Sequence, residues 1–285
     1  MKSIDRKQIC KSSTNMKHGL WLRKSVRPTL LSFAIIATTL FSPAFVRADN
    51  WRVVFEDEFN GTSLDPLKWD TCYWWHSGRG CANHGAQEIQ WFLPEEVLVQ
   101  DGILRLRTQK RIWNAYNATF QYTSGMISSH QRYAFQYGFV EIRAKVPKGR
   151  GFWPTMWLAA EDRNWPPEVN IGEFFGLDTK SVLMVLHYIN DRGKPTYSSL
   201  SWGNNFDFSE NYHVYAVLWE PNAIIWYVDG VERMRYTNSE NIPQKPMYIL
   251  TTLALGPIWT NKLPDESTPF PSYFDIDYIK VWQRQ

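Results

Sequence analysis

Two Asp-Gly pairs, Asp101-Gly102 and Asp229-Gly230, restrict the folds open to this chain more than any other feature of the sequence. Each pair lies between two short runs of β-branched and apolar residues. These flanking runs are 97–100, 103–108, 224–228 and 231–236. Asp-Gly favours the positive φ angles of a type I′ turn, whose twist matches that of the strands on either side. The sequence therefore predicts two antiparallel β-hairpins.

Runs of the same kind recur along the chain and are separated by Gly, Pro, Asn and Asp. Further strands are expected at 137–146, 181–189, 212–220, 247–255 and 274–282, and long loops at 203–211 and 260–272. Many short strands without alternating helical segments favour two packed antiparallel sheets. The expected fold class is therefore all-β, an antiparallel β-sandwich, and no repeat or linker divides it.

The first 48 residues contain the three parts of a signal peptide. A segment rich in Lys and Arg precedes the apolar run 29–41, and Val46-Arg47-Ala48 places small residues at the −3 and −1 positions of a cleavage site. The apolar run is short for a bilayer span, although an uncleaved anchor is the alternative. We therefore expect a signal peptide at 1–48, cleaved near Ala48, one domain at 49–285, and a secreted or periplasmic protein.

Removal of this leader would reverse the sign of the net charge. The leader contains 9 of the 31 Lys and Arg residues and 1 of the 28 Asp and Glu residues, so residues 49–285 carry a net charge of −5. A negative net charge gives no reason to expect a nucleic-acid partner. We expect a monomer that does not associate with membranes once the leader is cleaved.

Cys72 and Cys81 remain after cleavage and lie nine positions apart. In an oxidising compartment a disulfide is the expected outcome, and two free thiols are the alternative. A zinc site is not expected from this pair alone, because structural zinc needs four ligands.

Tryptophan is abundant, with 14 of the 15 residues outside the leader. Many of them stand beside polar residues, whereas a sandwich core alone needs fewer. The C–H faces of sugar rings stack on indoles while their hydroxyl groups need polar partners. This pattern suits a carbohydrate groove, with core packing as the other explanation for any single Trp. The tryptophans in polar surroundings are Trp74, Trp75, Trp91, Trp153, Trp157, Trp165, Trp202 and Trp259.

Two glutamates in the segment 165–176 form the main chemical candidate. On a strand, Glu168 and Asn170 would share one face, and a β-bulge at Gly172 would return Glu173 to that face. The two carboxyl groups would then approach to about 5–6 Å, the spacing typical of a retaining glycosidase. Acidic residues on a solvated strand face are the alternative explanation.

This segment resembles the active-site strand of glycoside hydrolase family 16, whose pattern is Glu-x-Asp-x-x-Glu. The resemblance covers essentially all of residues 49–285. It implies a concanavalin A-like jelly roll with a substrate cleft on its concave sheet, and retaining cleavage of β-linked glucans or galactans. The other similar segments are 55–61, 64–65, 68–69, 124–125, 137–138, 141–145, 151–154, 213–219, 227–230 and 277–281.

The resemblance implies that Glu168 is the nucleophile and Glu173 the general acid/base of a double displacement. Asn170 stands where the family has Asp, and an amide neither carries charge nor takes a proton. We therefore treat Asn170 as a modulator of the pair. The expected activity is endo-cleavage of β-1,3- or β-1,3/1,4-glucan, with galactan or bacterial exopolysaccharide as alternative substrates. The alternative functions are a transglycosylase and a carbohydrate-binding or exopolysaccharide-associated protein whose catalysis is impaired at Asn170.

Several further residues are candidates for substrate binding, each with a structural alternative. Trp157 would otherwise belong to the core, Arg143 to a structural ion pair, and His187 to the scaffold beside the glutamates. The Cys72–Cys81 loop would form a cleft wall. No cofactor is required, and the resemblance implies a structural calcium ion with Asp277 as its matching ligand. The candidate substrate-binding residues are Trp153, Trp157, Glu88, Gln90, Trp91, Arg143, His187 and Trp259.

Overall fold

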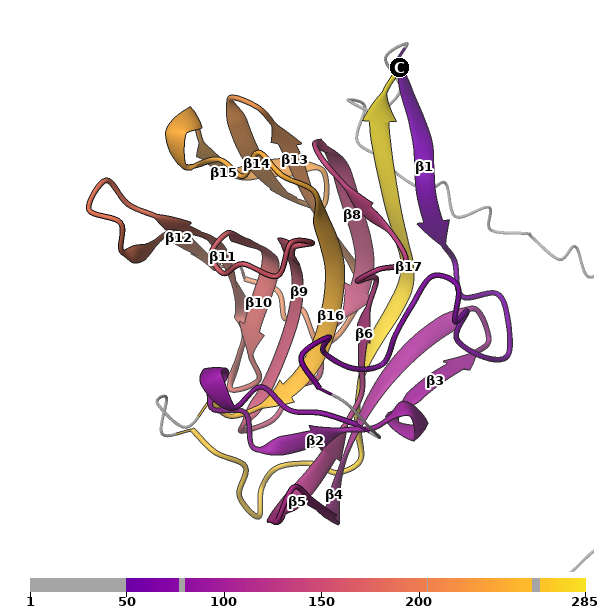
Figure 1. The fold of residues 1–285 in the computed structure, drawn as a ribbon. Helices are drawn as coiled ribbons and strands as arrows, with labels where there is room; N and C mark the ends of the chain where they lie inside the picture. The colour runs from indigo at the N-terminus through magenta and orange to yellow at the C-terminus, as the bar shows by residue number, and fades with distance from the viewer. Residues whose placement is uncertain (1–49, 77–79, 204, 258–261) are drawn as a thin grey trace, which may run out of the picture. The chain divides into compact units, whose positions relative to one another are not determined.

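The computed structural model describes residues 50–76, 80–203, 205–257 and 262–285. Strands dominate this part of the chain and form two sheets (Figure 1). The described part contains no helix with the length and apolar character needed to cross a membrane. The proposed leader and Trp259 lie outside the described residues, as do positions within both long loops that were expected.

The seven-stranded sheet carries the strand with the two glutamates. Its order is β12-β11-β10-β9-β16-β6, and β7 also pairs with β16. All of these pairs are antiparallel. The strands are β6 Met126–Ser128, β7 Ala134–Phe135, β9 Phe152–Ala160, β10 Glu168–Phe175, β11 Asp178–Ile189, β12 Pro195–Gly203 and β16 Met247–Leu255.

The ten-stranded sheet has the order β15-β14-β13-β8-β17-β4-β5-β2, with β1 paired to β17 and β3 to β4. Its pairs are antiparallel except β2 with β5. The strands are β1 Trp51–Asp57, β2 Gln90–Phe92, β3 Val97–Gln100, β4 Ile103–Ala115, β5 Ala118–Ser124, β8 Gly138–Lys145, β13 His213–Glu220, β14 Ala223–Val228, β15 Val231–Tyr236 and β17 Ser272–Arg284. Within the described residues, three short 3-10 turns complete the regular structure: η2 His84–Ala86, η3 Pro94–Glu96 and η4 Ser239–Asn241.

The hydrophobic core lies between the two sheets and follows the two-residue period of the strands. On β11, Val182, Met184 and Leu186 are fully buried, and Val140 and Ile142 of β8 in the other sheet belong to the same cluster. Since successive side chains on a strand point to opposite faces, the alternate residues of β11 face away from this core. The predicted all-β sandwich is therefore confirmed.

Both Asp-Gly hairpins form where the sequence predicts them. The φ angles of Asp101 and Gly102 are 55° and 74°, and those of Asp229 and Gly230 are 50° and 75°. Two consecutive positive φ angles are the requirement of a type I′ turn. The first hairpin differs in one respect, because β4 continues to Ala115 and forms a second hairpin with β5.

Candidate active site

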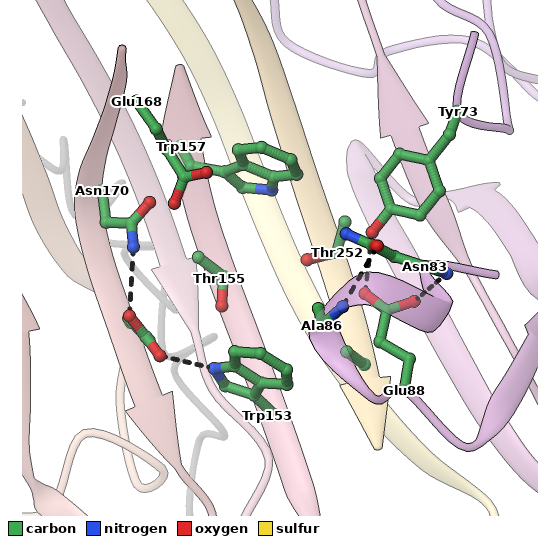
Figure 2. Close-up of a pocket in the computed structure, with 12 residues that line it drawn as sticks. Tyr73, Asn83, Ala86, Glu88, Trp153, Thr155, Trp157, Glu168, Asn170 and Thr252 are labelled. Carbon is green, nitrogen blue, oxygen red and sulfur yellow. Dashed lines mark hydrogen bonds between the residues drawn. The ribbon is translucent and has the colours of Figure 1, made fainter. Parts of the chain in front are cut away.

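A pocket opens on the face of the seven-stranded sheet that points away from the core (Figure 2). Three adjacent strands, β9, β10 and β16, form its floor, and Tyr73, Asn83, Ala86 and Glu88 line the side opposite to β10. Figure 2 shows Glu168 and Asn170 on one side of the pocket and Tyr73 and Glu88 on the other. The lining residues are Tyr73, Asn83, Ala86, Glu88, Trp153, Thr155, Trp157, Glu168, Asn170, Glu173, Thr252 and Ala254.

A β-bulge in β10 places both glutamates on the pocket face, as the sequence predicts. Asn170 pairs with Trp157 of β9 and Gly172 pairs with Met156, so Ile171 is the extra residue. The packing behind the glycine is tight, because a Cβ atom there would lie 3.1 Å from Met156 Cε and 3.3 Å from Val182 Cγ2. The bulge was predicted from its effect on side-chain direction, whereas the packing behind it depends on residues distant in sequence.

The bulge is also held from the opposite sheet. The indole Nε1 of Trp226, on β14, donates a hydrogen bond of 2.9 Å to the backbone oxygen of Asn170. Buried carbonyl groups need such partners, and this one lies outside the ladder of the seven-stranded sheet. The position of the glutamate pair therefore depends on both layers of the sandwich.

Glu173 accepts two hydrogen bonds from neighbouring side chains. Trp153 Nε1 donates to its Oε1 at 2.7 Å, and Asn170 Nδ2 donates to its Oε2 at 3.1 Å. Burial raises the pKa of Glu173 to about 7, the two donors oppose this rise, and the charge of Glu168 adds to it. Glu173 is therefore a carboxyl group that can hold or release a proton near neutral pH.

Glu168 is held at the other end of the motif. Trp165 Nε1 donates to its Oε2 at 2.9 Å, and His187 Nε2 lies 3.5 Å from its Oε1. Burial raises the pKa of Glu168 to about 7. Burial also lowers the pKa of His187, so that the imidazole is largely neutral near pH 7. His187 lies on β11, the strand beside β10, as expected from the sequence, and it is paired with Glu168.

Asn170 lies between the two glutamates and is 4% exposed. While its Nδ2 donates to Glu173, its Oδ1 has no hydrogen-bond partner among the described residues. A buried amide oxygen without a partner is costly. Rotation of the amide would exchange the two atoms, and Oδ1 could then accept a hydrogen bond from Glu173 when that carboxyl group is protonated.

Glu88 lies on the side of the pocket opposite to Glu168 and Asn170. It accepts hydrogen bonds from Tyr73 Oη at 2.8 Å, the Asn83 backbone N–H at 2.8 Å and Gln90 Nε2 at 3.0 Å. Burial raises the pKa of Glu88 to about 7. Gln90 is fully buried and also accepts from the Leu255 backbone, so it positions Glu88 and does not line the pocket.

The predicted disulfide between Cys72 and Cys81 is present. It closes the loop that carries Tyr73, whose ring stacks on that of Trp75 at a centroid distance of 4.3 Å. The loop therefore forms one wall of the pocket through Tyr73.

Two of the candidate binding residues lie away from the pocket. Trp91 is fully buried and packs with Leu93 and Phe120, because β2 pairs with the extended hairpin of β4 and β5. Arg143 belongs to β8 in the other sheet, where it forms an ion pair with Asp277 and lies over the ring of Tyr212. The predictions that these two residues contact substrate are corrected accordingly.

The surroundings of Asp277 do not fit a calcium ion. Its carboxylate is paired with the guanidinium group of Arg143. Across the described residues, no cluster of three or more His, Cys, Asp or Glu side chains could hold a metal. Calcium requires several oxygen ligands, and Asp277 supplies one that already has a cationic partner.

Some pocket residues were not predicted from the sequence. Thr155 lies between Trp153 and Trp157 at the two-residue spacing of one strand face, so the pattern contained a signal for it. Tyr73, Asn83 and Thr252 gave no such signal, because their places depend on how distant segments pack.

Comparison with known proteins gives a consistent set of relatives. The sequence pattern of glycosyl hydrolases family 16 matches residues 85–280. Endo-1,3-1,4-beta-glycanase EglC of Rhizobium meliloti is 31% identical over 243 residues, which are 80% of this chain and 51% of that protein. Glucan endo-1,3-beta-glucosidase A1 of Niallia circulans is 30% identical over 263 residues, which are 82% of this chain and 38% of that protein. The chain thus spans about half or less of the length of these curated relatives.

Solved structures give the same result. The laminarinase catalytic domain of Thermotoga maritima superimposes with a TM-score of 0.73 at 27% identity, covering 83% of this chain and 99% of that one. The endo-beta-1,3-glucanase of Pyrococcus furiosus superimposes with a TM-score of 0.72 at 28% identity, covering 82% of this chain and 95% of that one.

Proposed function

The chain belongs to glycosyl hydrolases family 16, and we propose that it is an endo-acting, retaining hydrolase of β-1,3- or mixed β-1,3/1,4-linked glucan. The observation that carries this proposal is the arrangement of Glu168 and Glu173. Both project from one strand into one pocket, and both have a pKa raised by burial to about 7. Paired carboxyl groups of this kind are the machinery of glycoside hydrolysis.

In the first step, ionised Glu168 attacks the anomeric carbon and Glu173 gives its proton to the leaving oxygen. In the second step, Glu173 removes a proton from water, which displaces Glu168 from the sugar. The charge of Glu168 helps Glu173 to keep its proton at the start. Formation of the glycosyl ester removes that charge, so the pKa of Glu173 falls just when a base is needed.

Substrate would lie across β9 and β10, beside Tyr73, Asn83 and Glu88. We propose that Trp153 and Trp157 contact sugar rings and that Glu88, held by Tyr73 and Asn83, accepts hydrogen bonds from sugar hydroxyl groups.

The N-terminal 48 residues are proposed to direct export and to be removed near Ala48. The remaining chain would act outside the cytoplasm as a monomer. The disulfide between Cys72 and Cys81 supports an oxidising compartment, since such bonds rarely persist where thiols are kept reduced.

A binding protein with impaired catalysis is the second candidate function. The observation that favours it is the hydrogen bond from Asn170 to Glu173, which stabilises the ionised form of the acid. An ionised Glu173 cannot protonate the leaving group in the first step.

The test is release of reducing sugar by the exported protein and by Glu168→Ala from laminarin, lichenan, agarose and carrageenan. Release from laminarin or lichenan that disappears in Glu168→Ala is expected. Release from agarose or carrageenan alone would reject a glucan as the substrate. Binding of a glucan by both proteins without any release would favour the second candidate.

A further inference from the structure

The pocket face of the seven-stranded sheet continues beyond the glutamates to the edge of the sheet. Glu168 pairs with His187 of β11, and His187 pairs with Tyr197 of β12, the edge strand (Figure 1). Directly paired residues on neighbouring strands share a face. The residues of β11 and β12 on this face, here named the β11–β12 strip, are Leu183, Val185, His187, Ile189, Pro195, Tyr197, Ser199 and Ser201.

This strip carries no Asp, Glu, Lys or Arg side chain. An uncharged surface does not suit the sulfate or carboxylate groups of an anionic polymer, which need cationic partners to replace water. The hydroxyl groups of Ser199 and Ser201 suit the hydroxyl groups of a neutral sugar instead. The chemistry of the strip therefore matches a neutral polysaccharide.

Two large aromatic side chains on this part of the sheet are unusually exposed. Tyr197 is 64% exposed and Trp165 is 58% exposed. Their ring centroids lie 5.8 Å and 5.7 Å from that of His187, which stands between them. Trp165 in turn donates to Glu168, so successive ring contacts connect Trp165, beside the glutamate, with Tyr197 on the edge strand. Burying such rings against the C–H faces of a sugar is favourable.

Tyr197 lies too far from Glu168 to contact the sugar that is attacked. Two strand spacings separate them, or about 10 Å between backbones. A sugar over Tyr197 must therefore lie farther along the polymer than the two units that flank the cleaved bond.

We infer that the β11–β12 strip is an extension of the cleft in which Tyr197 stacks on an additional sugar unit of a neutral β-glucan. This inference rests on the proposed function, because it assigns the strip to the same bound polymer. It predicts that long chains are better substrates than short ones through contacts made at Tyr197.

The test compares β-1,3-glucan oligosaccharides of three and six units as substrates for the wild-type protein, Tyr197→Ala and Leu200→Ala. Leu200 is a matched control, because it lies on the same edge strand, is 38% exposed and faces the opposite side. Tyr197→Ala is expected to lower the ratio of kcat/KM for the six-unit to the three-unit substrate about tenfold, the effect of one lost aromatic contact. Leu200→Ala should leave this ratio at the wild-type value. A wild-type ratio in Tyr197→Ala would overturn the inference.

Electrophoresis in gels that contain laminarin, lichenan or carrageenan separates this inference from the proposed function. The neutral glucans should retard the wild-type protein more than Tyr197→Ala, and carrageenan should retard neither. This pattern in a protein without hydrolytic activity would reject the proposed hydrolase function and support sugar binding by the β11–β12 strip. Equal retardation of both proteins, or retardation by carrageenan, would reject the inference about the β11–β12 strip even if the protein is an active hydrolase. A wild-type protein that neither cleaves nor binds any of these glucans would reject both.

Discussion

Glu173 accepts hydrogen bonds on both of its carboxylate oxygens, which links its protonation to two neighbours, Trp153 and Asn170. Both donors favour the ionised form, whereas burial and the charge of Glu168 favour the protonated form. The outcome is a pKa of about 7, near the value that a group acting first as acid and then as base requires. A single substitution at Asn170 can reverse its effect, so that the residue favours the protonated form of Glu173 instead of the ionised form.

Asn170→Asp should move the basic limb of the pH dependence of kcat/KM upward by about one unit. The substitution removes a donor to Glu173 and adds a negative charge beside it. Both changes raise the pKa of Glu173, so the acid keeps its proton to higher pH. Asn170→Ala removes only the donor and should shift the limb less. A limb that stays in place or moves downward in Asn170→Asp would show that this position is not electrostatically coupled to the pair.

The separate roles of the two glutamates can be read from the products formed with azide. On an aryl β-glucoside with a good leaving group, Glu168→Ala should form an α-glycosyl azide, because azide displaces the leaving group directly. Glu173→Ala should form a β-glycosyl azide, because Glu168 still makes the covalent intermediate. On polymer, Glu173→Ala should lower kcat by about 10²–10⁴-fold. The opposite assignment of anomers, determined by NMR of the products, would exchange the roles.

At the scale of single elements, features encoded by neighbouring residues were predicted from the sequence, whereas features that depend on strand pairing were not. Both Asp-Gly hairpins and the bulge in β10 follow from residues adjacent in sequence, and the structure contains all three. The surroundings of Trp91 and Arg143 depend on which strands pair with β2 and β8, which no local pattern specifies. Glu88 was predicted to bind substrate, but its contact with Tyr73 joins residues 15 positions apart and appears only in the fold.

The element β10 is supported from the opposite sheet, and Trp226→Phe tests this support. The substitution keeps a large aromatic ring and removes the donor to the Asn170 backbone oxygen. It should lower the free energy of unfolding by about 1–3 kcal/mol and, by loosening the bulge, lower kcat more than it changes KM. Urea unfolding and steady-state kinetics measure the two effects.

Trp219→Phe is the matched control for this prediction. Trp219 is also fully buried in the ten-stranded sheet, and its Nε1 donates to the Pro243 backbone oxygen at 3.0 Å. This control should lose similar stability while kcat keeps its wild-type value. Equal loss of kcat in both variants would mean that stability, and not the geometry of the bulge, limits activity.

At the scale of the whole molecule, the sandwich buries three carboxyl groups around one pocket. Glu88, Glu168 and Glu173 each have a pKa near 7, and burial is the largest cause in every case. The sequence indicated the pair on β10 because its spacing is local. It could not indicate the strength of burial, which depends on residues distant in sequence that line the same pocket, such as Tyr73 and Thr252. The pH dependence of folding is therefore a property of the assembled molecule.

Glu173→Gln should stabilise the protein more at pH 8 than at pH 5. The pKa of this group is about 7 in the folded state and 4.5 without the fold. Between these values the folded protein holds a proton that the unfolded chain has released, so wild-type stability falls as pH rises through this window. Glutamine does not titrate, and rotation of the Asn170 amide lets Oδ1 accept a hydrogen bond from the new side chain.

The advantage of the variant in free energy of unfolding should grow by about 1–3 kcal/mol from pH 5 to pH 8. The pKa values of His130 and His187 are lowered by desolvation and act in the opposite direction, but both contributions cancel in this difference. Urea unfolding at both pH values measures this difference, and Glu240→Gln, at an exposed position, is the control. An advantage that does not change with pH would show that folding does not raise the pKa of Glu173.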